Sequence, residues 1–98
     1  MIIRIVRMTF EDQYVDRFLE IFDMSKEKIR SFPGCRHLEL LVDVQHPNIF
    51  STYSMWENES DLNKYRDSEL FGQVWPDTKK LFAAPAVANS YYQKIKLG

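Results

Sequence analysis

The sequence contains little of what several common classes of protein require. It has a single cysteine, Cys35, which excludes an intrachain disulfide framework, and one thiol with two separated histidines offers no metal-ligand spacing. Its 13 basic and 14 acidic residues give a net charge of −1, which provides no basic field for nucleic acid or an anionic membrane. We therefore expect no metal, no nucleic-acid partner and no membrane partner.

Long apolar runs and targeting segments are missing as well. The N-terminal stretch MIIRIVRM is too short for a signal peptide or a membrane span, and Arg4 and Arg7 interrupt it. The chain has only three glycines, and neither a glycine-rich phosphate loop nor a nucleophile elbow is present. We expect a cytoplasmic protein.

The chain is rich in aromatic residues instead. Hydrophobic residues make up 45% of the 98 residues, and seven Phe, five Tyr and two Trp supply large buried areas per side chain. A chain of this length forms one small domain with a modest core. We expect a single globular domain over residues 1–98.

The central stretch predicts a β-hairpin. Cys35–Asp43 and Ile49–Trp56 read as strands, and Pro47 and Asn48 between them are turn formers. Both faces of the second strand carry apolar residues: Phe50, Thr52, Ser54 and Trp56 share one face, and Ile49, Ser51, Tyr53 and Met55 share the other. We therefore expect something to pack on each face of this hairpin.

The flanking segments predict two further strands and two helical regions. We expect a strand over Ile2–Met8 and a helix that Thr9 opens, with Asp12 completing a capping box and Pro33 ending the helix. After the hairpin, the expected features are an N-cap at Asn58, a break at 66–68 with Ser68 as a second N-cap, a kink or restart at Pro76, a helix end at 83–85 and a strand over Val87–Leu97.

This order of elements predicts an α+β fold. Strand, helix, strand, strand, helix, strand is the ferredoxin-like βαββαβ arrangement, a four-stranded antiparallel sheet with its helices on one side. The helices cover only one face, so the second apolar face needs another cover. We expect a homodimer in which two sheets pack together into a dimeric α+β barrel.

Several residues are candidates for a binding or catalytic site. Trp56, with Thr52 and Ser54 on the same strand face, forms an aromatic wall with two hydroxyls, which suits a planar aromatic ligand or core packing. Tyr65 and Trp75 either face the same space or belong to the core. His37 is a candidate general base or a surface or dimer-interface histidine. His46 and Cys35 are expected to be a solvated turn residue and a small buried thiol.

Two arginines on the first strand pose a separate question. Arg4 and Arg7 have opposite parity, so one of them must face an apolar layer, where an unpaired guanidinium is costly. That arginine either pairs with a carboxylate such as Glu39 or meets an anionic substrate.

In order and spacing, nearly the whole chain resembles the antibiotic biosynthesis monooxygenase (ABM) superfamily of dimeric α+β barrels. The segments that carry the resemblance are the Pro33-Gly34-Cys35 turn, the leucine-rich strand that follows it, Pro47-Asn48 before Phe50, the strand end Tyr53-Ser54-Met55-Trp56-Glu57, and Asp67-Ser68-Glu69-Leu70-Phe71. The chain departs from the commonest family pattern at two points. Ser54 stands where an acid is usual, and the frequent histidine near Glu69 or Leu70 is missing.

The resemblance implies a cofactor-independent oxygenase for a small aromatic or quinol-like compound, or a non-catalytic dimeric binding or stress-response module on the same scaffold. In one branch the pocket lies between the helices and the sheet, which would place Trp56 and Thr52 in its wall. Another branch degrades haem through a histidine ligand; Trp75 stands at that position and Tyr65 where a tryptophan would be, so the resemblance does not extend to haem degradation.

Overall fold

The computed structural model describes all residues, Met1–Gly98, and forms one four-stranded antiparallel sheet. The strands lie in the order β2-β3-β1-β4, so β1 and β3 are central and β2 and β4 are the edges. The elements in chain order are β1 (Ile2–Phe10), a 3-10 turn η1 (Asp12–Tyr14), α1 (Val15–Arg30), β2 (Cys35–Val42), β3 (Ile49–Trp56), α2 (Glu59–Arg66), α3 (Glu69–Lys79) and β4 (Phe82–Tyr92). The predicted α+β, ferredoxin-like fold is confirmed.

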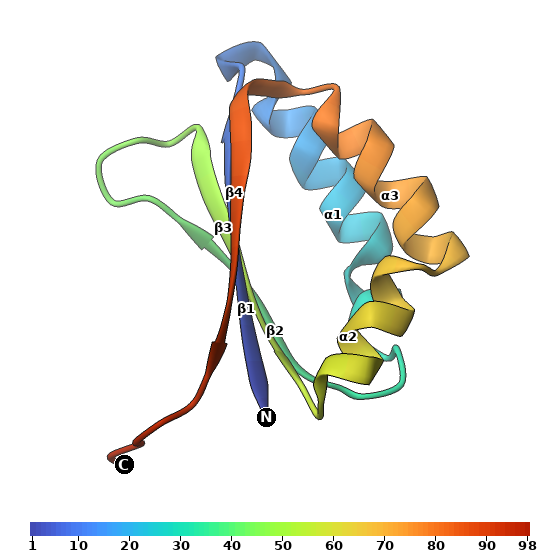
Figure 1. Cartoon of the computed structure of the whole chain (residues 1–98). Coiled ribbons are helices and arrows are strands. Elements are labelled where there is room, and N and C mark those ends of the chain that lie inside the picture. The colour runs from blue at the N-terminus through green and yellow to red at the C-terminus, as the bar shows by residue number, and fades with distance from the viewer.

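The molecule has two layers. Figure 1 shows α1, α2 and α3 together on one side of the sheet, while the other side carries no helix of this chain. None of the three helices has the length and apolar character needed to span a membrane.

Strand register assigns the side chains of β1 and β3 to the two faces. Ile2 lies opposite Trp56 and Met8 lies opposite Phe50, and all four side chains are buried under the helices. The core has two clusters: Met8, Phe10, Phe18, Phe50 and Leu81 at one end, and Ile2, Cys35, Trp56 and Leu62 at the other. The prediction that Phe50, Ser54 and Trp56 share one face is confirmed.

The predicted start of the first helix is wrong. Thr9 continues β1, where it pairs with Ile49 on one side and Ala84 on the other, and the strand runs to Phe10. The α-helix begins only at Val15, and Tyr14 at its N-cap provides no side-chain hydrogen bond. Pairing with both neighbouring strands satisfies the backbone of Thr9, which outweighs its local capping tendency.

The predicted position of the last strand is also wrong. The strand β4 begins at Phe82 rather than Val87 and ends at Tyr92 rather than Leu97, and Ala83–Pro85 lie inside it. Pro85 cannot donate a hydrogen bond, but β4 is an edge strand and its register against β1 shifts between Arg7 and Thr9. An edge position and a bulge are the places where a strand tolerates proline.

The capping predictions after the hairpin are confirmed. The Asn58 side chain accepts a hydrogen bond of 2.9 Å from the Asp61 amide, and the Ser68 hydroxyl accepts one of 3.1 Å from the Phe71 amide. These caps start α2 and α3 as two separate helices, and Pro76 lies within α3 without ending it. Two short helices, separated by a break, cover the same face of the sheet as α1.

The turn between α1 and β2 depends on Gly34. Its φ of +89° lies in the region that L side chains rarely adopt, and a Cβ at this position would collide with the Asp61 side chain of α2. Because Gly34 has no side chain, the turn between α1 and β2 can pack directly against Asp61 of α2.

We predict that Gly34→Ala lowers the free energy of unfolding by about 1–3 kcal/mol, because it adds left-handed strain and a steric conflict. The control is Gly72→Ala in α3, where no atom lies near the added Cβ. That change should stabilise the protein by about 0.5–1 kcal/mol because alanine favours the helix. Urea unfolding of both variants measures the difference; equal stabilities would contradict the assigned role of Gly34.

Candidate functional site

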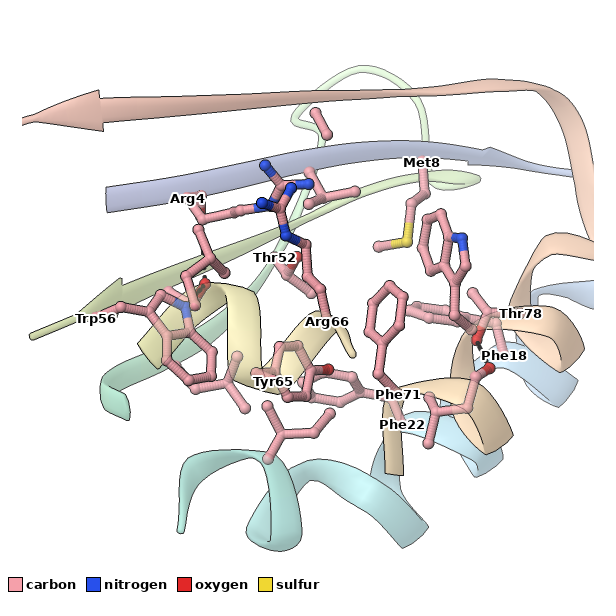
Figure 2. Close-up of a pocket in the computed structure, with 18 residues that line it drawn as sticks. Arg4, Met8, Phe18, Phe22, Thr52, Trp56, Tyr65, Arg66, Phe71 and Thr78 are labelled. Carbon is pink, nitrogen blue, oxygen red and sulfur yellow. Dashed lines mark hydrogen bonds between the residues drawn. The ribbon is translucent and has the colours of Figure 1, made fainter. Parts of the chain in front are cut away.

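An apolar cavity lies between the sheet and the helices. It has a volume of about 120 Å³, and 13 of its 18 lining residues are hydrophobic (Figure 2). An apolar cavity of roughly 150 Å³ holds a benzene ring, so this slightly smaller cavity accommodates at most about one aromatic ring. Pockets of this composition, with a few polar groups among apolar walls, are the usual sites for small molecules.

The strand side of the pocket is built by β3. Trp56 is 1% exposed, and its Nε1–H donates a 3.0 Å hydrogen bond to Ser54 Oγ. The indole N–H is therefore already used within the protein, and Trp56 offers the ligand only its ring. Thr52, two residues before Ser54 on the same strand face, also lines the cavity.

The helix side of the pocket is a chain of aromatic rings. Tyr65 stacks on Trp56, with ring centroids 4.9 Å apart and an interplanar angle of 24°. Phe71 meets Tyr65 edge-on at 5.3 Å and stacks on Trp75 at 5.7 Å. The structure thus brings the four predicted substrate-binding residues, Trp56, Thr52, Tyr65 and Trp75, into one cavity.

The hydroxyl groups of the lining differ in what they offer a ligand. Ser54 accepts from Trp56, and Thr78 donates a 2.9 Å hydrogen bond to the Val74 carbonyl. The hydroxyls of Thr52 and Tyr65 form no hydrogen bond within the protein, and both residues line the cavity. Neither oxygen is a fully buried group without a partner. These two groups are free to bind an oxygen on a ligand.

Burial changes the proton affinity of the tyrosine. Loss of solvent around the phenol raises the pKa of Tyr65 to about 12, with a smaller contribution from Cys35. Tyr65 therefore remains a neutral hydrogen-bond donor throughout the physiological range and does not act as a base.

The structure does not bring His37 to this pocket. The register of β2 against β3 shifts between Cys35 and His37, so Cys35 lies opposite Trp56 while His37 lies opposite Met55. This bulge turns Cys35 into the core and His37 to the open sheet face, where His37 lies 2.5 Å from Glu39 and meets Tyr53 edge-on. The strand period of two would place Cys35 and His37 on one face, and the bulge separates them. A general base at His37 would have to act on the other side of the sheet.

Two arginines supply the only charges in the pocket lining. Arg4, on β1, shares its face with Val6 and Met8, and Arg66 is the last residue of α2. Figure 2 shows the two guanidinium groups next to each other at one side of the cavity. Sequence parity indicated that Arg4 or Arg7 faces an apolar layer. Arg66 was not predicted as a site residue, because it stands in a polar stretch at a helix end.

Acid–base and metal-binding groups are not assembled here. The lining contains no histidine, aspartate, glutamate or cysteine, and no group of three or more such side chains anywhere in the chain could hold a metal ion. The arrangement can enclose a planar ring, hydrogen-bond its oxygens and place positive charge beside it. It cannot remove a proton with a side chain of its own.

Comparison with known proteins gives a consistent family signal. A family model described as antibiotic biosynthesis monooxygenase matches residues 1–75. No curated protein matches the chain in sequence. Among solved structures, a conserved protein from Methanosarcina mazei Go1 is similar with a TM-score of 0.90 and 20% identity, over 96% of this chain and 94% of that one.

Two further structures agree with that likeness. An antibiotic biosynthesis monooxygenase superposes with a TM-score of 0.89 and 20% identity, over 95% of this chain and 98% of its own. Rv0793 from Mycobacterium tuberculosis gives a TM-score of 0.90 and 13% identity, over 99% of this chain and 98% of its own. At these identities the structural likeness shows a shared fold.

We predict that Tyr65 is the tyrosine whose ionisation follows a pKa of about 12. A raised pKa means that neutral Tyr65 stabilises the fold fully below the ordinary tyrosine pKa of about 10, and that this contribution is lost as the pH rises from about 10 to 12. Tyrosinate absorbance during alkaline titration should show a late step that Tyr65→Phe removes and Tyr14→Phe, on the protein surface, leaves in place. A late step that survives Tyr65→Phe would contradict the assignment.

Proposed function

The chain belongs to the antibiotic biosynthesis monooxygenase family, and we propose that it is a cofactor-independent monooxygenase acting on a small aromatic or quinol-like compound. The observation that carries the proposal is the ring-sized apolar cavity that brings together Trp56, Thr52, Tyr65 and Trp75. An aromatic compound can lie among these rings with its oxygens directed at the free hydroxyls of Thr52 and Tyr65.

The proposed reaction draws its electrons from the substrate. A ring carbon flanked by activating groups loses a proton to a solvent water, and the resulting carbanion transfers electrons to dioxygen. For a methylene substrate the balance is R₂CH₂ + O₂ → R₂C=O + H₂O: the carbon loses four electrons, one oxygen atom enters the substrate and the other leaves as water. The apolar walls exclude bulk water, and the aromatic rings fix the orientation of the substrate.

One observation favours a second candidate. No histidine or carboxylate lines the cavity, and Ser54 occupies the position where the family commonly has an acid. A pocket without a base fits a non-catalytic dimeric module that binds a small molecule, including a stress-response protein. Oxygen consumption separates the two functions, because a module binds aromatic compounds without consuming oxygen.

We also propose that the protein acts as a homodimer. The sheet face without helices carries Ile3, Ile5, Ile49, Tyr53 and Met55 on the central strands, together with Leu41, Val87 and Tyr91 on the edge strands. Leu41, Val87 and Tyr91 are 43%, 51% and 49% exposed. Contiguous apolar surface of this kind is typical of an interface, and a twofold axis would pair the face with its own copy.

We predict that Thr52→Ala lowers kcat/KM roughly tenfold, because the ligand loses a hydrogen bond inside an apolar site. Trp56→Phe should lower it by at least as much, since the smaller ring leaves Tyr65 without its stacking partner. The measurement is oxygen consumption with a panel of single-ring hydroquinones; anthrones, with three fused rings, serve as compounds too large for a cavity of about 120 Å³. Ser60→Ala, at an exposed position of α2 outside the cavity lining, is the control and should keep wild-type activity. Absence of oxygen uptake with every compound would overturn the monooxygenase and leave the binding module.

We predict that light scattering at micromolar concentration gives twice the 11.7 kDa mass of the chain. Ile5→Lys, at the centre of the open face opposite Tyr53 and Asn89, should produce a monomer, because a buried lysine without a partner strongly opposes association. A wild-type protein that remains a monomer would contradict the dimer.

A further inference from the structure

The charge of the pocket lining has no counter-ion within the protein. The structure contains five ion pairs, and none of them includes Arg4 or Arg66. Glu39, considered from the sequence as a partner for Arg4, pairs with His37 on the opposite sheet face. Glu59 lines the neighbouring hollow with Arg66 but forms no ion pair with it. Arg4 is partly buried and Arg66 is exposed, and neither has a carboxylate partner beside the largely apolar cavity.

Each guanidinium retains most of its hydrogen-bond donors. Arg4 Nη1 donates a 3.1 Å hydrogen bond to Ser90 Oγ on β4, and Arg66 Nη2 donates to Asn63 Oδ1 one turn earlier on α2. Both acceptors are neutral, so they orient the guanidinium groups without neutralising them. Partial burial lowers the pKa of Arg4, and repulsion by the like charge of Arg66 lowers it further.

An ionised oxygen would relieve this repulsion. A carboxylate or phenolate between two guanidinium groups accepts several charge-assisted hydrogen bonds, which are stronger than those between neutral groups. The aromatic rings of Trp56, Tyr65 and Phe71 lie in the same cavity, so the ring of such a ligand would have apolar walls while its oxygen faced the arginines.

From this juxtaposition we propose that the ligand of the pocket is an aromatic anion, whose ionised oxygen binds between Arg4 and Arg66. The inference deepens the proposed function by naming the substrate class. The binding of an anion does not depend on the proposed function, but the oxidation of that anion does. The inference also supplies what the lining lacks: positive charge beside a phenol or enol favours its ionised form, so the proton passes to solvent and no side-chain base is needed.

Binding of benzoate and benzamide to the intact protein tests the inference, because the two compounds match in shape and differ in charge. Calorimetry at pH 7 should show benzoate binding about tenfold more tightly than benzamide. Arg4→Gln and Arg66→Gln should each weaken benzoate binding about threefold, which is half of that preference on a logarithmic scale, and leave benzamide binding unchanged. Arg17→Gln, on the exposed side of α1 and paired only with Glu20, is the matched control and should change neither.

A second probe shows whether the ionised oxygen of the ligand is a phenolate or enolate, or instead a carboxylate. The absorbance of bound 4-nitrophenol reports its ionisation directly, and two arginines should lower the apparent pKa of the bound phenol by about one to three pH units. A lowered value that returns toward that of free 4-nitrophenol in both arginine variants identifies a phenolate or enolate as the anion. Preference for benzoate with an unchanged phenol identifies a carboxylate remote from the reacting oxygen.

Other results would overturn the inference. These are equal affinities for benzoate and benzamide, affinities that the arginine variants leave unchanged while circular dichroism shows them folded, or no binding of any of the three probes. None of these probes is oxidised by the proposed reaction, so binding is measured apart from turnover. A preference for the anionic probes, combined with no oxygen uptake on the panel of oxidisable substrates, would reject the monooxygenase and keep the anion site. Oxygen uptake without a preference for anionic probes would keep the monooxygenase and reject the anion site.

Discussion

The pairing of β1 between β3 and β4 is the constraint on which the rest of the structure depends. It fixes which side chains of β1 face the helices: Ile2, Met8 and Phe10 supply the core, while Arg4 in the same row brings a charge into the pocket. It also places Trp56 and Ser54 beside that arginine. One register therefore determines both the hydrophobic packing and the polar chemistry of the cavity, and a slip by one residue would exchange the two faces of the sheet.

Different strands and helices supply different parts of the pocket lining. The strand β3 supplies a rigid ring whose N–H is already occupied by Ser54. The three helices supply the remaining rings, with Phe18 and Phe22 from α1, and α2 supplies one of the cations. Because α2 and α3 are separate capped helices, Tyr65 and Arg66 lie close to the break between them. Such short helices hold their side chains mainly through packing against the sheet, so ligand contacts on this side depend on the aromatic stack.

Much of this could be predicted from the sequence because the signals are local. Two-sided apolar strands, turn formers at Pro47 and Asn48 and caps at Asn58 and Ser68 define the order of elements, and the strand period predicts that Thr52 and Trp56 share a face. The failures have non-local causes. Thr9 has the chemistry of a helix cap, but two neighbouring strands bind its backbone. Pro85 reads as a terminator, and only its place at a sheet edge allows it in β4. Nothing in the sequence around Arg66 marks it as a site residue, because its role depends on the packing of α2 beside Arg4.

The bulge at the start of β2 has a consequence for how such a domain can change over time. Cys35 and His37 lie on opposite sides of the sheet although the simple period of two would place them together. One extra residue in a strand thus decides whether two neighbouring side chains, here Cys35 and His37, face the same side of the sheet or opposite sides. In this fold the insertion or deletion of a single codon within a strand can change which reactive side chains face the cavity. No other amino acid of the chain needs to be substituted.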